Sequence, residues 1–176
     1  VAGNYAYVKD GGDLQVIDVS NKNSPSISGT LDFGASVAMQ DIRLAGKYAY
    51  IVAEGGSGSN VFIIDISSPS SPAIANSWDT GLSGNSLELS GKYLFVGHDN
   101  GDGSITIVYD VTDVYNPVML YYGNLRGSSI NEFAAMGGRM AYGTDTATQQ
   151  EFVVLDIYSI QLAYLFRRNI FELHHK

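Results

Sequence analysis

The chain of 176 residues is 45% hydrophobic and 16% charged, contains no cysteine, and carries a formal net charge of −8 at pH 7. The lack of cysteine excludes a disulfide scaffold, a cysteine-ligated metal site and a cysteine nucleophile. The acidic charge opposes binding to nucleic acid, and no apolar run approaches the ~20 residues that a membrane-spanning helix needs. The length suits a single domain, 1–176, with a sizeable core.

Two phrases open the chain. Residues 3–8 read GNYAYV and residues 14–25 read LQVIDVSNKNSP. Their apolar parts are rich in aromatic and β-branched residues, which favour strands. The segment KDGGD (9–13) between them predicts a hairpin turn. The Ser, Asn and Pro residues after Asp18 predict a second turn, because proline donates no hydrogen bond to a sheet.

Both phrases recur along the chain. The first returns as GKYAYI, GKYLFV and GRMAYG, and the aspartate of the second returns after 47, 45 and 46 residues, at Asp65, Asp110 and Asp156. Two phrases that repeat in step are improbable by chance. A period in the forties is typical of solenoids and propellers.

Each period holds four strand-like segments: the aromatic phrase, the segment ending in the aspartate, one after the proline, and one at MQDIRL, NSLEL or NEFAAM. The segment before the aspartate is apolar at adjacent positions, as at Ile63-Ile64, so both of its faces should be covered. This pattern predicts an all-β fold, a β-propeller or partial propeller of about four blades of four-stranded antiparallel sheet. The approximate blades are 1–35, 36–81, 82–127 and 128–176.

The phrases GKYAYI and FIIDISSPSSP resemble the LVIVD repeat, a β-propeller-like unit of bacterial and archaeal proteins, many of them secreted or on the cell surface. The resemblance covers nearly the whole chain and implies the fold. It implies no activity, because that family shares no catalytic motif. The fourth unit departs from the pattern, since Ala163 replaces the turn proline and Met140 replaces a tyrosine.

The first blade is expected to hold three strands, because Val1 corresponds to the end of an innermost strand. The segment 169–176 resembles residues 85–92, yet only 10 residues separate Ala163 from Leu173, where the other repeats use 17 to 19. An extended chain gains at most ~3.3–3.6 Å per residue, which opposes closure by this segment. Three arrangements stay open: part of a longer propeller, which we favour, a partial propeller completed by a second copy, and a closed four-blade ring.

The repeated aspartates could suggest a carboxylate array. A residue that recurs at one place in every blade serves the blade, however, and we expect these carboxylates to accept N–H groups of the following turn. Binding residues should lie on the variable loops instead, namely KDGGD, AEGGSGSN, HDNGDGS and TDTATQQ.

The loop HDNGDGS is the most polar of the four. Asp99 and Asp102 could supply oxygen ligands to calcium, with Asn100 beside them. The spacing does not match an EF-hand loop, because glycines occupy two of the ligand positions, so a solvated hairpin turn is favoured. Apart from calcium, the sequence predicts no cofactor.

Three further residues are candidates for binding. Trp78 could form a platform for a sugar or peptide, although filling the space between blades is favoured. Tyr122 and Arg126 offer an aromatic and cationic cluster of the kind found in binding hot spots, although packing within the blade is favoured. His98 is the only histidine in the body of the chain, and no nucleophile elbow accompanies it.

The sequence therefore predicts a binding or assembly module, extracellular or on the cell surface, that contacts a protein or carbohydrate through variable loops. A hydrolase of glycosidase type, with its site on the loops of one propeller face and using His98, Asp99 or Asp102, is the alternative. A structural subunit that self-associates through open sheet edges is a third reading.

Overall fold

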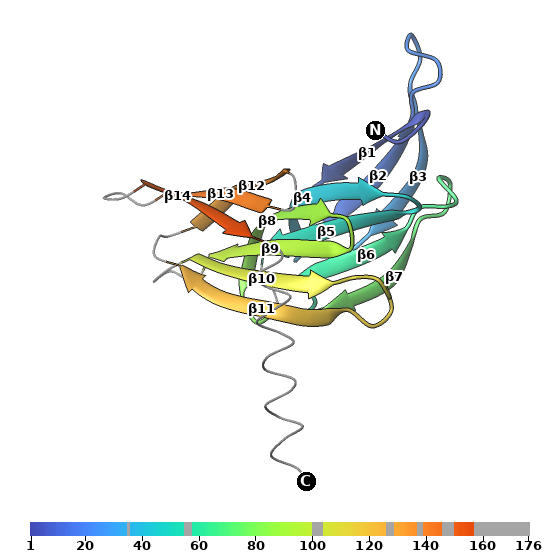
Figure 1. Cartoon of the computed structure of the whole chain (residues 1–176). Helices are drawn as coiled ribbons and strands as arrows, with labels where there is room; N and C mark the ends of the chain where they lie inside the picture. The colour runs from blue at the N-terminus through green and yellow to red at the C-terminus, as the bar shows by residue number, and fades with distance from the viewer. Residues whose placement is uncertain are drawn as a thin grey trace. The chain divides into compact units, whose positions relative to one another are not determined.

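A computed structural model describes residues 1–34, 36–54, 58–99, 104–125, 129–136, 139–145 and 150–156. All of the regular structure in these ranges is β-strand, arranged in four antiparallel sheets (Figure 1). The described residues contain no helix able to cross a membrane. The chain forms two compact units, Val1–Asn85 and Ser86–Lys176, and each is described by itself.

The first unit contains two sheets. One has the order β1-β2-β3, and the other has the order β4-β5-β6-β7. The first sheet consists of β1 (Tyr5–Asp10), β2 (Asp13–Asp18) and β3 (Ser26–Asp32). The second consists of β4 (Ala38–Ala45), β5 (Tyr48–Glu54), β6 (Val61–Asp65) and β7 (Ala73–Trp78). Sequence neighbours pair throughout, as expected for meanders joined by short turns.

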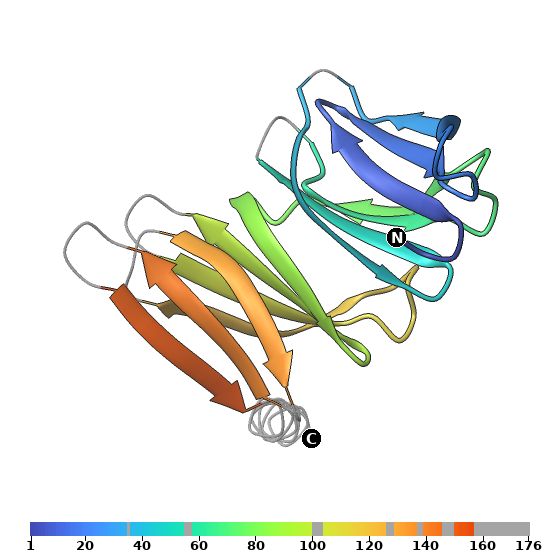
Figure 2. The same ribbon diagram turned by 90° about the horizontal axis from the view of Figure 1, so that it is seen from above.

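The other two sheets belong to the second unit, apart from the first residues of β8. The third has the order β11-β10-β9-β8, and its arrows alternate in direction (Figure 2). It consists of β8 (Ser83–Ser90), β9 (Tyr93–Asp99), β10 (Ser104–Asp110) and β11 (Val118–Leu125). The fourth consists of β12 (Ser129–Met136), β13 (Arg139–Asp145) and β14 (Gln150–Asp156). Each of the four sheets falls within one of the predicted blades.

In the second and third sheets the segment before the repeated aspartate is buried on both faces, as predicted, whereas Ile17 of β2 is only partly buried. On β6, Ile63 and Ile64 are both fully buried, and on β10 Val108 is fully buried while Tyr109 is 7% exposed. One face of β6 contributes Phe62 and Ile64 to a core shared by the first two sheets. This core also contains Leu14, Met39, Ala49, Ile51, Ala53 and Ile66. Burial of these side chains, worth ~1.5–3 kcal/mol each for the larger ones, holds the two sheets together.

A β-bulge recurs at the same place in three sheets. On β3 the register skips Ser28, since Val16 pairs with Gly29 and Ile17 pairs with Ile27. The bulge recurs on β7, where Ala75 is skipped, and on β11, where Leu120 is skipped. In all three the extra residue stands three positions after the turn proline. A bulge bends its strand and increases the local twist.

The fourth sheet departs from the others in register. In the first three sheets the repeated aspartate pairs with the first tyrosine of the aromatic phrase, as Asp65 does with Tyr48. In the fourth sheet Asp156 pairs with Arg139, one residue before the position of that tyrosine. Met140, which replaces the tyrosine, is fully buried. Met140 can be buried here because its side chain is apolar, whereas the other repeats carry a tyrosine at this position.

Candidate functional site

One end of the first unit gathers three connections. They are the β1–β2 turn, residues 33–34 and 36–37 between β3 and β4, and the two sides of the β5–β6 hairpin at Glu54 and 58–60. Two cavities open among these segments, and Val37 lines both of them. Variable loops that surround cavities at one end of a sheet pair are the usual place for a binding site.

The β1–β2 turn is as tight as the sequence predicts. Asp10 pairs with Asp13, which leaves a two-residue turn of Gly11 and Gly12. Gly11 has a φ of 60°, a conformation that favours glycine. A Cβ on Gly12 would lie 2.4 Å from the carbonyl oxygen of Gly34, so only glycine allows this approach.

The segment after β3 is held against this turn. The backbone N–H of Phe33 donates to the carbonyl of Gly12 at 2.9 Å. Asp32 Oδ1 accepts the N–H of Gly34 at 2.6 Å, and Gly34 O accepts the N–H of Val37 at 3.1 Å. These bonds fix where Val37 stands between the two cavities.

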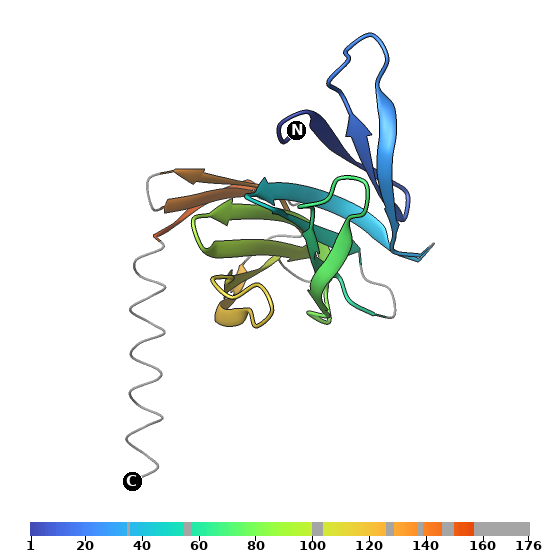
Figure 3. The same cartoon turned by 90° about the vertical axis from the view of Figure 1, so that its right-hand side faces the viewer.

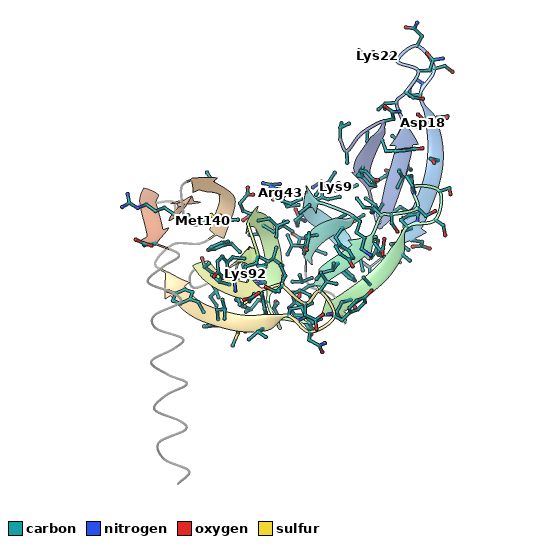
Figure 4. The ribbon with its side chains drawn as sticks, turned by 45° about the vertical axis from the view of Figure 1, so that its right-hand side comes forward. Lys9, Asp18, Lys22, Arg43, Lys92 and Met140 are labelled. Carbon is teal, nitrogen blue, oxygen red and sulfur yellow. The ribbon has the colours of Figure 1, made fainter. Side chains whose placement is uncertain are left out.

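The first cavity has a volume of about 330 Å³. It is lined by Lys9, Gly11, Gly12, Val37, Ala38 and Met39. Lys9 Nζ donates to the carbonyl of Gln40 at 2.6 Å. Gln40 is the skipped residue of a bulge between β4 and β5, where Met39 pairs with Ala53 and Asp41 pairs with Val52. Because of the bulge, the carbonyl of Gln40 does not pair within the sheet and can accept the hydrogen bond of Lys9. Figure 4 shows Lys9 between β1 and the second sheet.

The second cavity has a volume of about 230 Å³. Its lining combines aromatic, hydroxyl and carboxylate groups: Phe33, Ser36, Val37, Glu54, Gly58, Ser59 and Phe62. The rings of Phe33 and Phe62 meet edge to face, with centroids 4.9 Å apart and planes at 73°. Glu54 is exposed and makes none of the ion pairs found among the described residues. Its charge is therefore available to a ligand.

Asn60 shapes the wall beside the second cavity. It is 1% exposed, and its side chain donates to Thr80 Oγ1 at 2.8 Å and to the carbonyl of Leu82. Its Oδ1 accepts the N–H of Thr80 at 3.0 Å. Its backbone N–H donates to the carbonyl of Trp78 at 3.0 Å. A buried amide satisfied in this way fixes the end of the hairpin.

Three of the predicted binding residues have described side chains, and none of the three is among the described residues that line these cavities. His98 is fully buried on β9 and pairs with Ile105. Trp78 ends β7, where it is half-buried with its indole nitrogen inside. Tyr122 lies on β11 and is 53% exposed. The side chain of Asp99, together with Asn100, Asp102 and Arg126, lies outside the described residues, so their roles stay predictions.

Three of the repeated aspartates serve turns. Asp18, Asp65 and Asp110 accept the N–H of the residue two positions later at 2.8, 2.9 and 2.9 Å. The hydrogen bonds from Ser20 and Ser67 lower the pKa of Asp18 and Asp65. Burial alone would raise the pKa of Asp110, but hydrogen bonds from Lys92 and Thr112 outweigh it and lower the pKa. These carboxylates are structural, as predicted, and the turn after Asp156 lies outside the described residues.

No group of three His, Asp or Glu side chains in the described part of the chain could hold a metal ion. The calcium prediction rests on Asp99 and Asp102 and stays a prediction, because neither side chain is described.

Sequence reasoning singled out the loops of this end but not Lys9, Phe33 or Phe62. Lys9 begins the predicted loop KDGGD and Glu54 is the second residue of AEGGSGSN, so the sequence could have pointed to both. Phe33 stands in no repeated phrase, and it meets Phe62 only because the first two sheets pack face to face.

Solved structures of three proteins share this fold. A candidate 6-phosphogluconolactonase from Bacteroides uniformis has a TM-score of 0.68 at 15% identity, covering 88% of this chain and 53% of that one. A periplasmic gluconolactonase from Pseudomonas aeruginosa has a TM-score of 0.63 at 13% identity, covering 88% and 52%. A protein from Lactobacillus plantarum has a TM-score of 0.62 at 15% identity, covering 87% and 52%. The chain spans about half the length of these proteins.

These likenesses confirm the predicted fold class, an all-β fold of propeller type. A comparison with curated proteins gives no match. The family model described as the LVIVD repeat matches residues 1–32, 38–80 and 83–120, which is more than half of the sequence. The aromatic phrase and the aspartate phrase lie inside each matched segment, and the chain belongs to the LVIVD repeat family.

Proposed function

We propose that the protein is a binding module that takes its partner at the loop end of the first unit. The observation that carries this proposal is the gathering of three connections around two adjoining cavities. Their linings include Lys9, Glu54 and the Phe33–Phe62 pair. Linings that combine apolar side chains with a few charged and hydroxyl groups are typical of ligand sites, and the partner is a protein segment or a carbohydrate.

We place this function outside the cytoplasm, at the cell surface or in the periplasm. The low content of charged residues, with 12 tyrosines and 20 glycines, supports an extracytoplasmic surface. The periplasmic gluconolactonase with the same fold supports the same location, although the likeness extends to the fold alone.

The test is binding to arrays of glycans and short peptides by the whole chain and by a blocked variant. Ser36 and Ala38 are exposed residues that line the second and first cavities, so the double substitution Ser36→Trp/Ala38→Trp fills both openings. The matched control, Ser24→Trp/Thr30→Trp, places the same side chains at exposed positions away from the cavities. We expect binding to be lost only in the blocked variant; equal binding by both would refute the site.

A hydrolase is the second candidate, because two proteins that share the fold are described as lactonases. A catalytic His98 would need contact with substrate, and its complete burial opposes that role. An esterase, lactonase and glycosidase screen of the whole chain, with Asp99→Ala and Asp102→Ala as controls, separates the two candidates. Turnover lost in either variant would replace the binding proposal.

A further inference from the structure

The two cavities carry opposite charges on either side of one apolar residue. Lys9 is the only charged residue that lines the first cavity, and Glu54 is the only one that lines the second, among the described residues. Val37 belongs to both linings, so the two spaces adjoin. A ligand that occupies both would meet an ammonium group at one end and a carboxylate at the other.

Both charged residues are attached to the same stretch of strand β4. The ammonium group of Lys9 is fixed on the carbonyl of Gln40, and Glu54 is the cross-strand partner of Ala38. Ala38 and Gln40 are two residues apart on the strand, so these two points of attachment lie within roughly 7 Å of each other. An extended peptide of two residues spans roughly the same distance between its ends.

Both charged groups have the capacity to bind a ligand. One of the three N–H donors of Lys9 is used by Gln40, so two stay free for a carboxylate. The Glu54 carboxylate, with Ser36 and Ser59 beside it, can accept the hydrogen bonds of an amino terminus. Met39 supplies apolar surface in the first cavity and Phe33 in the second.

We propose that this site binds a short peptide with free termini, its carboxylate at Lys9 and its ammonium at Glu54. The inference rests on the proposed function and narrows it to one class of ligand. A neutral carbohydrate would use the hydroxyl and aromatic groups of the second cavity but would leave Lys9 without a counterpart.

The experiment is an NMR titration of the labelled whole chain with leucyl-alanine, its N-acetyl derivative and its C-terminal amide. For the wild type we expect each derivative to bind about three- to fivefold more weakly than the free dipeptide, the size of one exposed ion pair. In Lys9→Gln, the C-terminal amide should bind as tightly as the free dipeptide, because the protein no longer has the ammonium group that the peptide carboxylate would contact. In Glu54→Gln, the N-acetyl derivative should bind as tightly as the free dipeptide, because the protein no longer has the carboxylate that the peptide ammonium would contact.

Lys22→Gln is the matched control. Lys22 is exposed in the turn between β2 and β3, which Figure 4 labels beyond the ends of those strands, and its loss should leave all three affinities unchanged. If both derivatives bind the wild type with the same affinity as the free dipeptide, the inference is overturned. Binding of glycans without peptides would overturn it too and leave the proposed function standing, whereas a chain that binds neither refutes both.

Discussion

At the scale of single residues, Asn60 is the buried polar group on which the β5–β6 hairpin depends. We predict that Asn60→Ala lowers the free energy of unfolding by about 1–3 kcal/mol, because Thr80 loses the acceptor of its partly buried N–H. Asn60→Asp keeps that acceptor but buries a charge, and should be no better tolerated. Urea unfolding measures both. Ser59→Ala, which removes only the partly exposed bond to Ser77, should cost less than about 1 kcal/mol; a similar loss in both alanine variants would contradict this role of Asn60.

At Asp110, the contributions of the turn hydrogen bonds and of the ion pair to stability can be measured separately. Its carboxylate accepts hydrogen bonds from the N–H and Oγ1 of Thr112 and from Lys92 Nζ, the last at 2.7 Å. Asp110→Asn keeps an acceptor for the turn and should cost at most about 1 kcal/mol. Asp110→Ala removes all three bonds and should cost about 1–3 kcal/mol. Equal thermal midpoints for the two variants would show that the turn bond contributes nothing.

At the scale of elements, β3 approaches the turn after β6 so closely that Gly29 leaves no room for a side chain. A Cβ on Gly29 would lie 2.5 Å from the carbonyl oxygen of Pro69 and 2.9 Å from the carbonyl carbon of Ser70. We predict that Gly29→Ala destabilises the chain by about 1–3 kcal/mol through this overlap. Thr30→Ala, exposed on the same strand, is the control for chemical denaturation, and a neutral Gly29→Ala would mean that the two segments separate freely.

Strand β1 differs from its counterpart β5 in what covers its edge. The N–H of Val19 donates to the carbonyl of Asn4 at 2.8 Å, so by the two-residue period the amides of Tyr7 and Lys9 point away from β2. No other strand within the described ranges pairs with that edge, and Figure 3 shows β1 in dark blue at the margin of its sheet. The equivalent residues of β5, Tyr50 and Val52, face β4.

This difference predicts contrasting hydrogen exchange. We expect the amides of Tyr7 and Lys9 to exchange roughly 100-fold faster than those of Tyr50 and Val52, because the latter are bonded inside a four-stranded sheet. Residue-resolved exchange of the whole chain measures the four amides side by side. Comparable protection would show that another strand lies along β1 in solution.

At the scale of the whole molecule, acid should destabilise the protein through its turn carboxylates. The pKa values of Asp18, Asp65, Asp110 and Asp113 lie below the ordinary 3.8. Carboxyls with a lowered folded pKa stabilise the protein above their ordinary pKa, and the contribution is lost as the pH falls through the folded value. The thermal midpoint should therefore fall between roughly pH 5 and pH 2, and less steeply for Asp110→Asn. An unchanged slope in that variant would exclude Asp110 from the effect.

The repeated phrases predicted most of the fold, and they could not predict the site. Asp65 and Pro72 act within one sheet, and the burial of Ile63-Ile64 follows from adjacent apolar positions on one strand, so local pattern was sufficient to place them. Lys9 lies on β1 and Phe33 follows β3 of the first sheet, whereas Glu54 ends β5 of the second, and only the packing of the two sheets brings them to one end of the unit. The register change at Met140 was also beyond prediction, because a single substitution does not reveal how the opposite strand shifts.

The recurrent bulge constrains how this chain can lengthen by duplication. The bulge residue lies three positions after the turn proline in each of three sheets. A duplicated repeat, running from one aromatic phrase to the next, would therefore contain its own bulge. Such a repeat could be inserted without changing which side chains of the neighbouring strands face the core. A single-residue deletion at Ser28, Ala75 or Leu120, by contrast, would move the side chains of the rest of that strand to the opposite face of the sheet. Natural relatives should therefore vary in whole repeats and in loop length, while the residue count between proline and bulge stays constant.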